Sequence, residues 1–85
     1  MPKSVFSDAY ASFLRVLVAA RKDAGISQVE LARRVGRDQQ FISLVERGVR
    51  RVDVVEFYVL ARGIGTDPIE LFRSVALSMP ARIDI

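Results

Sequence analysis

The sequence predicts an all-α domain of five helices. Apolar residues recur at spacings of three and four, polar capping residues stand before four of the segments, and glycines follow the first four. The expected helices cover about residues 7–24, 27–35, 38–47, 53–62 and 67–78. The β-branched run 52–55 is interrupted by Asp53, which fits the start of a helix better than a strand.

The first helix is predicted from its apolar spacing and the second from its boundaries. The apolar residues of the first segment recur at three and four: Tyr10, Phe13, Leu14 and Leu17. Ser27 is expected to cap the second helix, because Ser27 followed three residues later by Glu30 fits a capping box. Gly36 follows this helix, where a left-handed C-terminal cap is favoured.

The last three helices are predicted from similar signals. Asp38 is an N-cap residue at the start of the third. The fourth and fifth begin with two more capping-box patterns, Asp53 with Glu56 and Asp67 with Glu70. The apolar residues of these two segments again follow helical spacing: Val54, Phe57, Leu60, Ala61 and Ile64, then Ile69, Phe72, Val75 and Ala76.

Composition limits the chemistry that the chain can perform. The 85 residues contain no cysteine and no histidine, which excludes disulfides, thiolate metal sites and Ser-His or Cys-His catalysis. No glycine-rich phosphate loop is present, so an enzyme is not expected. The longest apolar runs have five residues, far fewer than the roughly 18 of a membrane span. We therefore expect a cytoplasmic, nucleoid-associated protein with no membrane partner, no metal and no cofactor.

Positive charge is concentrated in one part of the chain. The net charge is +3, yet residues 33–51 contain six arginines against Asp38 and Glu46, a net of +4, so the remainder carries −1. Such a concentration is typical of a surface that contacts nucleic-acid phosphates.

The second and third predicted helices are joined by Gly36 and Arg37 alone. Such a short turn sets two helices at a steep angle, as in a helix-turn-helix. The segments 28–32, Gln-Val-Glu-Leu-Ala, and 41–48, Phe-Ile-Ser-Leu-Val-Glu-Arg-Gly, together with Gly36 between them, resemble the phage-repressor (Cro/xenobiotic-response-element, XRE) helix-turn-helix family. Most of residues 10–72 fit this resemblance, and the short layout is also similar to that of restriction–modification controller proteins.

The resemblance implies a five-helix lambda-repressor-like domain over residues 1–85, with the helix-turn-helix at 27–48. It also implies that the third helix enters the DNA major groove. The residues expected to contact bases are then Gln39, Gln40 and Ser43, and those expected to contact phosphates are Gln28, Arg37, Arg47, Arg50 and Arg51. By the same resemblance, Arg21 and Glu46 are expected to form a partly buried structural ion pair.

The fifth helix and the tail, residues 67–85, are expected to form a homodimer. A domain this small hides only part of its 51% hydrophobic residues, which leaves apolar side chains for a partner. The expected interface residues are Tyr58, Ile69 and Phe72. The resulting hypothesis is a sequence-specific transcriptional regulator, bound as a dimer to a near-palindromic operator. Two alternatives stay open: the antitoxin of a toxin–antitoxin pair, and a helical adaptor that binds only protein.

Overall fold

The computed structural model describes residues 5–84, with side chains from Asp8 onward. Over this range the chain is all-α. Its five helices are α1 (Val5–Asp23), α2 (Gln28–Val35), α3 (Gln39–Glu46), α4 (Val54–Ile64) and α5 (Pro68–Ser78). The predicted fold class is confirmed, and each expected helix is present to within two residues at either end. Residues 1–4 and Ile85, which the domain prediction includes, lie outside the described residues.

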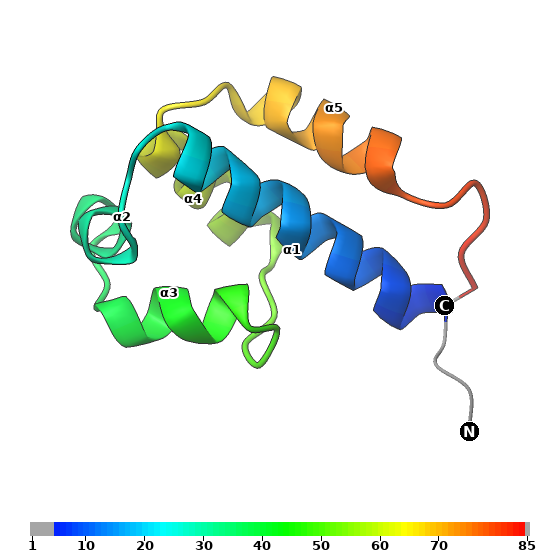
Figure 1. Cartoon of the computed structure of the whole chain (residues 1–85), viewed down its shortest axis with the longest axis horizontal. Helices are drawn as coiled ribbons and strands as arrows, with labels where there is room; N and C mark the ends of the chain where they lie inside the picture. Colours follow the sequence, from blue (N-terminus) through cyan, green and yellow to red (C-terminus); the bar gives the residue numbers. More distant parts are fainter. Residues whose placement is uncertain (1–4, 85) are drawn as a thin grey trace.

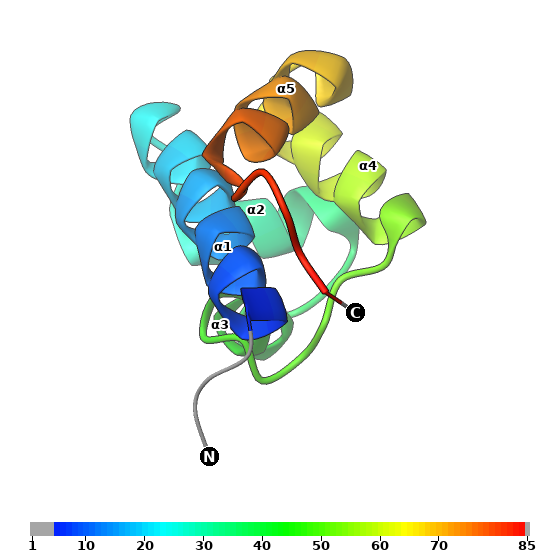
Figure 2. The ribbon, with the colours of Figure 1, turned by 90° about the vertical axis from the view of Figure 1, so that its right-hand side faces the viewer.

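The long helix α1 forms one side of the domain, and α5 runs back alongside it in the opposite direction (Figures 1 and 2). The shorter helices α2 and α3 pack against each other at one end of α1, and α4 lies against both α2 and α5. Within the described part, no helix combines the length and apolar character that crossing a bilayer requires.

Four side chains set the helix starts as predicted. Ser27, Asp38 and Asp53 each accept a hydrogen bond from the backbone N–H three residues on, while Asp67 accepts from the N–H of Ile69, two residues on. Of the three expected capping boxes, the one that begins at Asp53 is complete, because the carboxylate of Glu56 also accepts a hydrogen bond from the backbone N–H of Asp53. The box expected at Ser27 lacks the second bond, and the box expected at Asp67 lacks both, because Asp67 accepts from Ile69 and not from Glu70. The glutamates of these two helices instead pair with arginines one turn further along.

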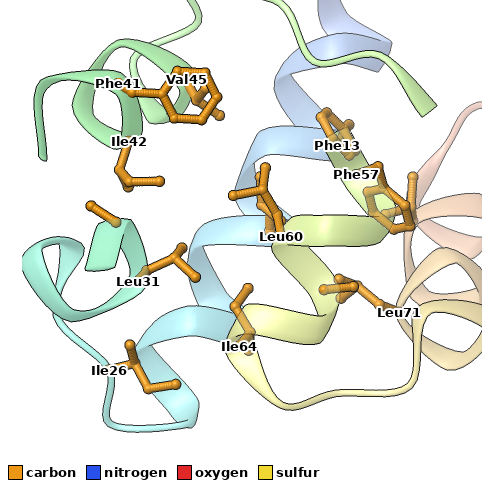
Figure 3. Packing of buried hydrophobic residues seen from close by; sticks show 14 residues of the cluster. Phe13, Ile26, Leu31, Phe41, Ile42, Val45, Phe57, Leu60, Ile64 and Leu71 are labelled. Carbon is orange, nitrogen blue, oxygen red and sulfur yellow. The ribbon is translucent and has the colours of Figure 1, made fainter. Parts of the chain in front are cut away.

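The core lies where all five helices converge. Leu60 of α4 lies near its centre, with Ile42 and Leu31 approaching from the helix-turn-helix and Phe13 and Phe57 from the other side (Figure 3). The largest fully buried side chains are Leu31, Ile42, Leu60, Val45 and Val75. The core therefore fixes α2 and α3 against the rest of the domain.

Gly63 has a different role from the one expected. The fourth helix was expected to end at residue 62, with Gly63 and Gly65 after it, but α4 continues through Gly63, and Gly65 takes the left-handed cap, with a φ of 91°. A Cβ on Gly63 would lie 2.7 Å from Cγ1 of Val35 and 3.0 Å from Cδ1 of Leu31. The glycine thus allows α2 to pack closely on α4.

Candidate nucleic-acid interface

The turn between α2 and α3 has the geometry that the sequence predicts. Gly36 adopts a left-handed φ of 74°, and the N–H of Arg37 donates to the carbonyl of Ala32 at 2.9 Å. The side chain of Asp38 then accepts from the N–H of Phe41 at 2.9 Å and starts α3. Ala32 is small and buried, which allows α3 to cross α2 closely.

One face of α3 packs in the core and the other is presented outward. Phe41, Ile42 and Val45 are buried. Gln39 and Gln40 are exposed on the first turn, and Ser43, one turn on, is half-buried. The Ser43 hydroxyl accepts a hydrogen bond from Nε of Arg47 at 3.2 Å. The three residues expected to contact bases therefore lie on the outer side of α3, Gln39 and Gln40 in its first turn and Ser43 in the next.

Beneath this face lies an ion pair between Arg21 of α1 and Glu46 of α3. Nε and Nη2 of Arg21 donate to the two carboxylate oxygens at 2.6 and 2.9 Å, and Nη1 donates to the carbonyl of Ile26 at 2.8 Å. Both side chains are only 9% exposed. The structure thus contains the pair that the resemblance implies, and the two hydrogen bonds between Arg21 and Glu46 join α1 to α3.

The ion pair continues into the outer face through Gln28, a connection that the sequence analysis missed. Nε2 of Gln28 donates to Oε1 of Glu46 at 2.9 Å, and Nε2 of Gln39 donates to Oε1 of Gln28 at 3.2 Å. We call Arg21, Glu46, Gln28 and Gln39 the polar network. Because the Glu46 carboxylate accepts a hydrogen bond from the amide nitrogen of Gln28, the amide oxygen of Gln28 is the atom that faces Gln39. These hydrogen bonds connect the buried ion pair to Gln39, the first residue of α3, and orient its side chain.

The arginines around α3 differ in their partners. Arg50 makes a bidentate ion pair with Glu56, at 3.0 and 2.6 Å, and also donates to the carbonyl of Arg51. This pairing, with the bond from the Asp53 N–H, holds the pKa of Glu56 below its ordinary value. A phosphate contact by Arg50 therefore has to compete with Glu56.

The other three predicted arginine ligands contact an aromatic ring or a hydroxyl. The guanidinium of Arg37 lies 3.9 Å from the ring centroid of Phe41, that of Arg51 lies 4.4 Å from the ring of Tyr10, and Arg47 bonds the Ser43 hydroxyl described above. Such stacking on a ring face orients the guanidinium.

On α2, Arg33 and Arg34 both pair with Glu30. Their side-chain hydrogen bonds lower the pKa of Glu30 from 4.5 to about 2. This exposed cluster offsets part of the positive charge of the segment.

The fold and the turn between α2 and α3 define a helix-turn-helix protein. A family model described as helix-turn-helix matches residues 17–71, so the chain belongs to this family of DNA-binding transcriptional regulators. The XRE type is indicated by an XRE-family like protein from Pseudomonas syringae pv. tomato. It has 45% identity and a TM-score of 0.82, over 89% of this chain and 93% of that one.

Two further relatives agree with this assignment. The chain is 39% identical, over 51 residues, to the uncharacterized HTH-type transcriptional regulator y4dJ of Sinorhizobium fredii; the match spans 60% of this chain and 66% of that protein. It is also similar to the restriction-modification controller protein C.AhdI from Aeromonas hydrophila. That similarity has 36% identity and a TM-score of 0.67, over 74% of this chain and 91% of that one.

Proposed function

We propose that this protein binds double-stranded DNA in a sequence-specific manner, as a homodimer on a near-palindromic operator, with α3 in the major groove. The observation that carries the proposal is the placement of Gln39 and Gln40 on the first turn of α3. Both side chains are exposed, and Gln39 is oriented by a hydrogen bond to Gln28. An oriented side chain loses less conformational freedom when it binds a base edge, and that favours specific recognition.

The chemistry of these side chains favours adenine. A glutamine amide carries a donor and an acceptor, which match N7 and the N6 amino group of adenine in the major groove. Gln39 uses one amide N–H inside the polar network, and its carbonyl oxygen and second N–H are the groups that would meet a base. Ser43 extends the same face by one turn and is the third candidate for base contact.

Phosphate contacts are proposed for residues that flank α3. Gln28 stands at the first position of α2, where the helix dipole favours an anion. Arg37 and Arg47 flank α3, and Arg51 follows it. Of the predicted arginine ligands, Arg50 is the one expected to contribute least, because Glu56 already binds its guanidinium in two places.

The proposed dimer surface lies on α4 and α5. Tyr58, Ile69 and Phe72 are 52%, 73% and 56% exposed, although all three are large and apolar. They line a shared groove with Val54 and Pro68. Contiguous exposed apolar surface of this kind marks an interaction site. A two-fold contact there would present two copies of α3 to half-sites about 34 Å apart.

The test is base selectivity. Binding sites are first selected from a random DNA pool, and affinity is then measured by competition with the selected and a scrambled duplex. Gln39→Ala and Gln40→Ala should each weaken the selected duplex, by about 1–3 kcal/mol at one base position, and leave the scrambled duplex nearly unchanged. Ser74→Ala, on exposed α5 surface, serves as the control. Equal losses on both duplexes, or failure to enrich any site, would contradict the proposal.

A further inference from the structure

The segment between α3 and α4, residues 47–53, carries three of the arginines discussed above. It is anchored at both ends. At its start, the N–H groups of Val49 and Arg50 both donate to the carbonyl of Leu44, at 3.0 and 3.1 Å. At its end, Asp53 forms the complete capping box of α4. Residues 51 and 52 lie between these anchors, where Arg50 donates to the carbonyl of Arg51.

A tyrosine from a distant part of the chain also contacts these two residues. Oη of Tyr10, on α1, accepts a hydrogen bond from the backbone N–H of Val52 at 3.1 Å. The ring of the same tyrosine lies 4.4 Å from the guanidinium carbon of Arg51. One side chain thus contacts two consecutive residues of the segment, the first through its side chain and the second through its backbone.

The ring of Tyr10 is itself held by the core. Its centroid lies 5.4 Å from that of Phe13, which is buried, and Phe13 in turn lies 5.9 Å from Phe57. The ring therefore has a defined position before any ligand arrives. Ring packing alone does not require the hydroxyl, since a phenylalanine would pack against Phe13 in the same way. The hydroxyl has its use at Val52.

We propose that Tyr10 is a positioning residue for DNA phosphate contact. Its hydroxyl fixes the backbone at Val52, and its ring lies against the guanidinium of Arg51 and orients it. An arginine held in this way loses less side-chain freedom on binding a phosphate than a mobile one. This inference rests on the proposed function, because it concerns how the same DNA surface is arranged.

The first test measures phosphate contacts. The logarithm of the DNA affinity is followed against the logarithm of the salt concentration for Tyr10→Leu, Arg51→Ala and the double variant. Each single change should reduce the slope by about one unit. The double variant should show no further reduction, because both changes remove the same contact. Arg82→Ala, which removes one arginine from the exposed tail, is the matched control and should change the slope far less.

The second test needs no DNA and keeps the ring in place. In Tyr10→Phe, hydrogen exchange at the Val52 amide should become about five- to tenfold faster, while exchange at the core amide of Leu60 stays unchanged. This variant keeps the inference testable even if Tyr10→Leu fails to fold.

The outcomes separate the two proposals. An unchanged slope in Tyr10→Leu, additive losses in the double variant, or an unchanged Val52 amide in Tyr10→Phe would each overturn the positioning role of Tyr10. A parent protein that binds DNA without any salt dependence, or not at all, would instead overturn the proposed function and with it the phosphate role of Tyr10.

Discussion

Replacing Glu46 with alanine is expected to destabilise the fold strongly. The change removes the carboxylate that accepts two hydrogen bonds from Arg21 and one from Gln28. Arg21 would keep only its bond to the carbonyl of Ile26, and its guanidinium would remain charged in a site where the residue is 7% exposed. An unpaired buried charge is among the costliest defects that a single substitution can create.

The expected loss is about 3–5 kcal/mol, the range for breaking a buried pair by removing one partner. A domain of this size has a total free energy of unfolding of about 4–13 kcal/mol. The loss should therefore lower the melting temperature by roughly 12–40 °C, since each kcal/mol corresponds to about 4–8 °C in a small domain. Glu30→Ala is the matched control, because Glu30 pairs with two arginines at the surface, and it should melt close to the parent.

A double variant separates folding from recognition. Arg21→Met with Glu46→Leu replaces the ion pair with apolar side chains, an exchange that is often neutral or stabilising. Its melting temperature should recover most of the loss. Selectivity for the chosen DNA site should not recover, because Gln28 would still lack the acceptor that orients it.

Thermal melts are recorded at one protein concentration, because dimerisation makes the melting temperature depend on concentration. A Glu46→Ala variant that melts like the parent would refute the energetic reasoning. A double variant that recovers both stability and selectivity would show that the ion pair is purely structural and that Gln39 does not depend on it.

Four further outcomes are expected. Arg47→Ala should weaken selected and scrambled duplexes alike and reduce the salt slope by about one unit; an unchanged slope in a salt titration would contradict this. Phe72→Glu should sediment as a monomer and bind the selected site much more weakly, whereas a variant that stays dimeric would place the interface elsewhere. Gly63→Ala should cost about 1–3 kcal/mol in thermal melts, because its Cβ would overlap Val35 unless α2 shifts. The stability contributed by Glu56, whose folded pKa is lowered from 4.5, should be fully present above pH 4.5 and be lost as the pH falls through the folded value. The melting temperature of Glu56→Gln should therefore depend less on pH in this acid range than that of the parent protein. Parallel curves of melting temperature against pH for the two proteins would contradict this contribution of Glu56.

The helix starts could be predicted because each depends on a local interaction. A capping side chain bonds a backbone N–H two or three residues away, so Ser27, Asp38, Asp53 and Asp67 are recognisable in the sequence. The reciprocal bond of a capping box is less predictable, since it competes with other partners of the same carboxylate. Glu30 has two arginines one turn ahead and binds those instead.

Features decided by tertiary contact could not be predicted. Gly63 and Gly65 have the same intrinsic freedom, yet Gly65 takes the left-handed cap, while Gly63 lies inside α4 where α2 approaches closely. The bond between Gln28 and Gln39 joins two helix starts that the turn brings together, and no local spacing signals it. The partner of Arg50 was also missed, because the sequence analysis assigned Glu56 only to the capping box.

The fixed direction of the hydrogen bonds in the polar network limits how the specificity of such a protein can change during evolution. Glu46 binds the amide nitrogen of Gln28, so the residue at position 39 faces an oxygen and must offer a donor. Glutamate there would bring two acceptors together, and rotating the Gln28 amide would only move that conflict to Glu46. Acidic residues at position 39, which would accept from cytosine, are therefore disfavoured unless the buried pair changes as well. Gln40 takes no part in the network, so new base preferences should arise first at position 40.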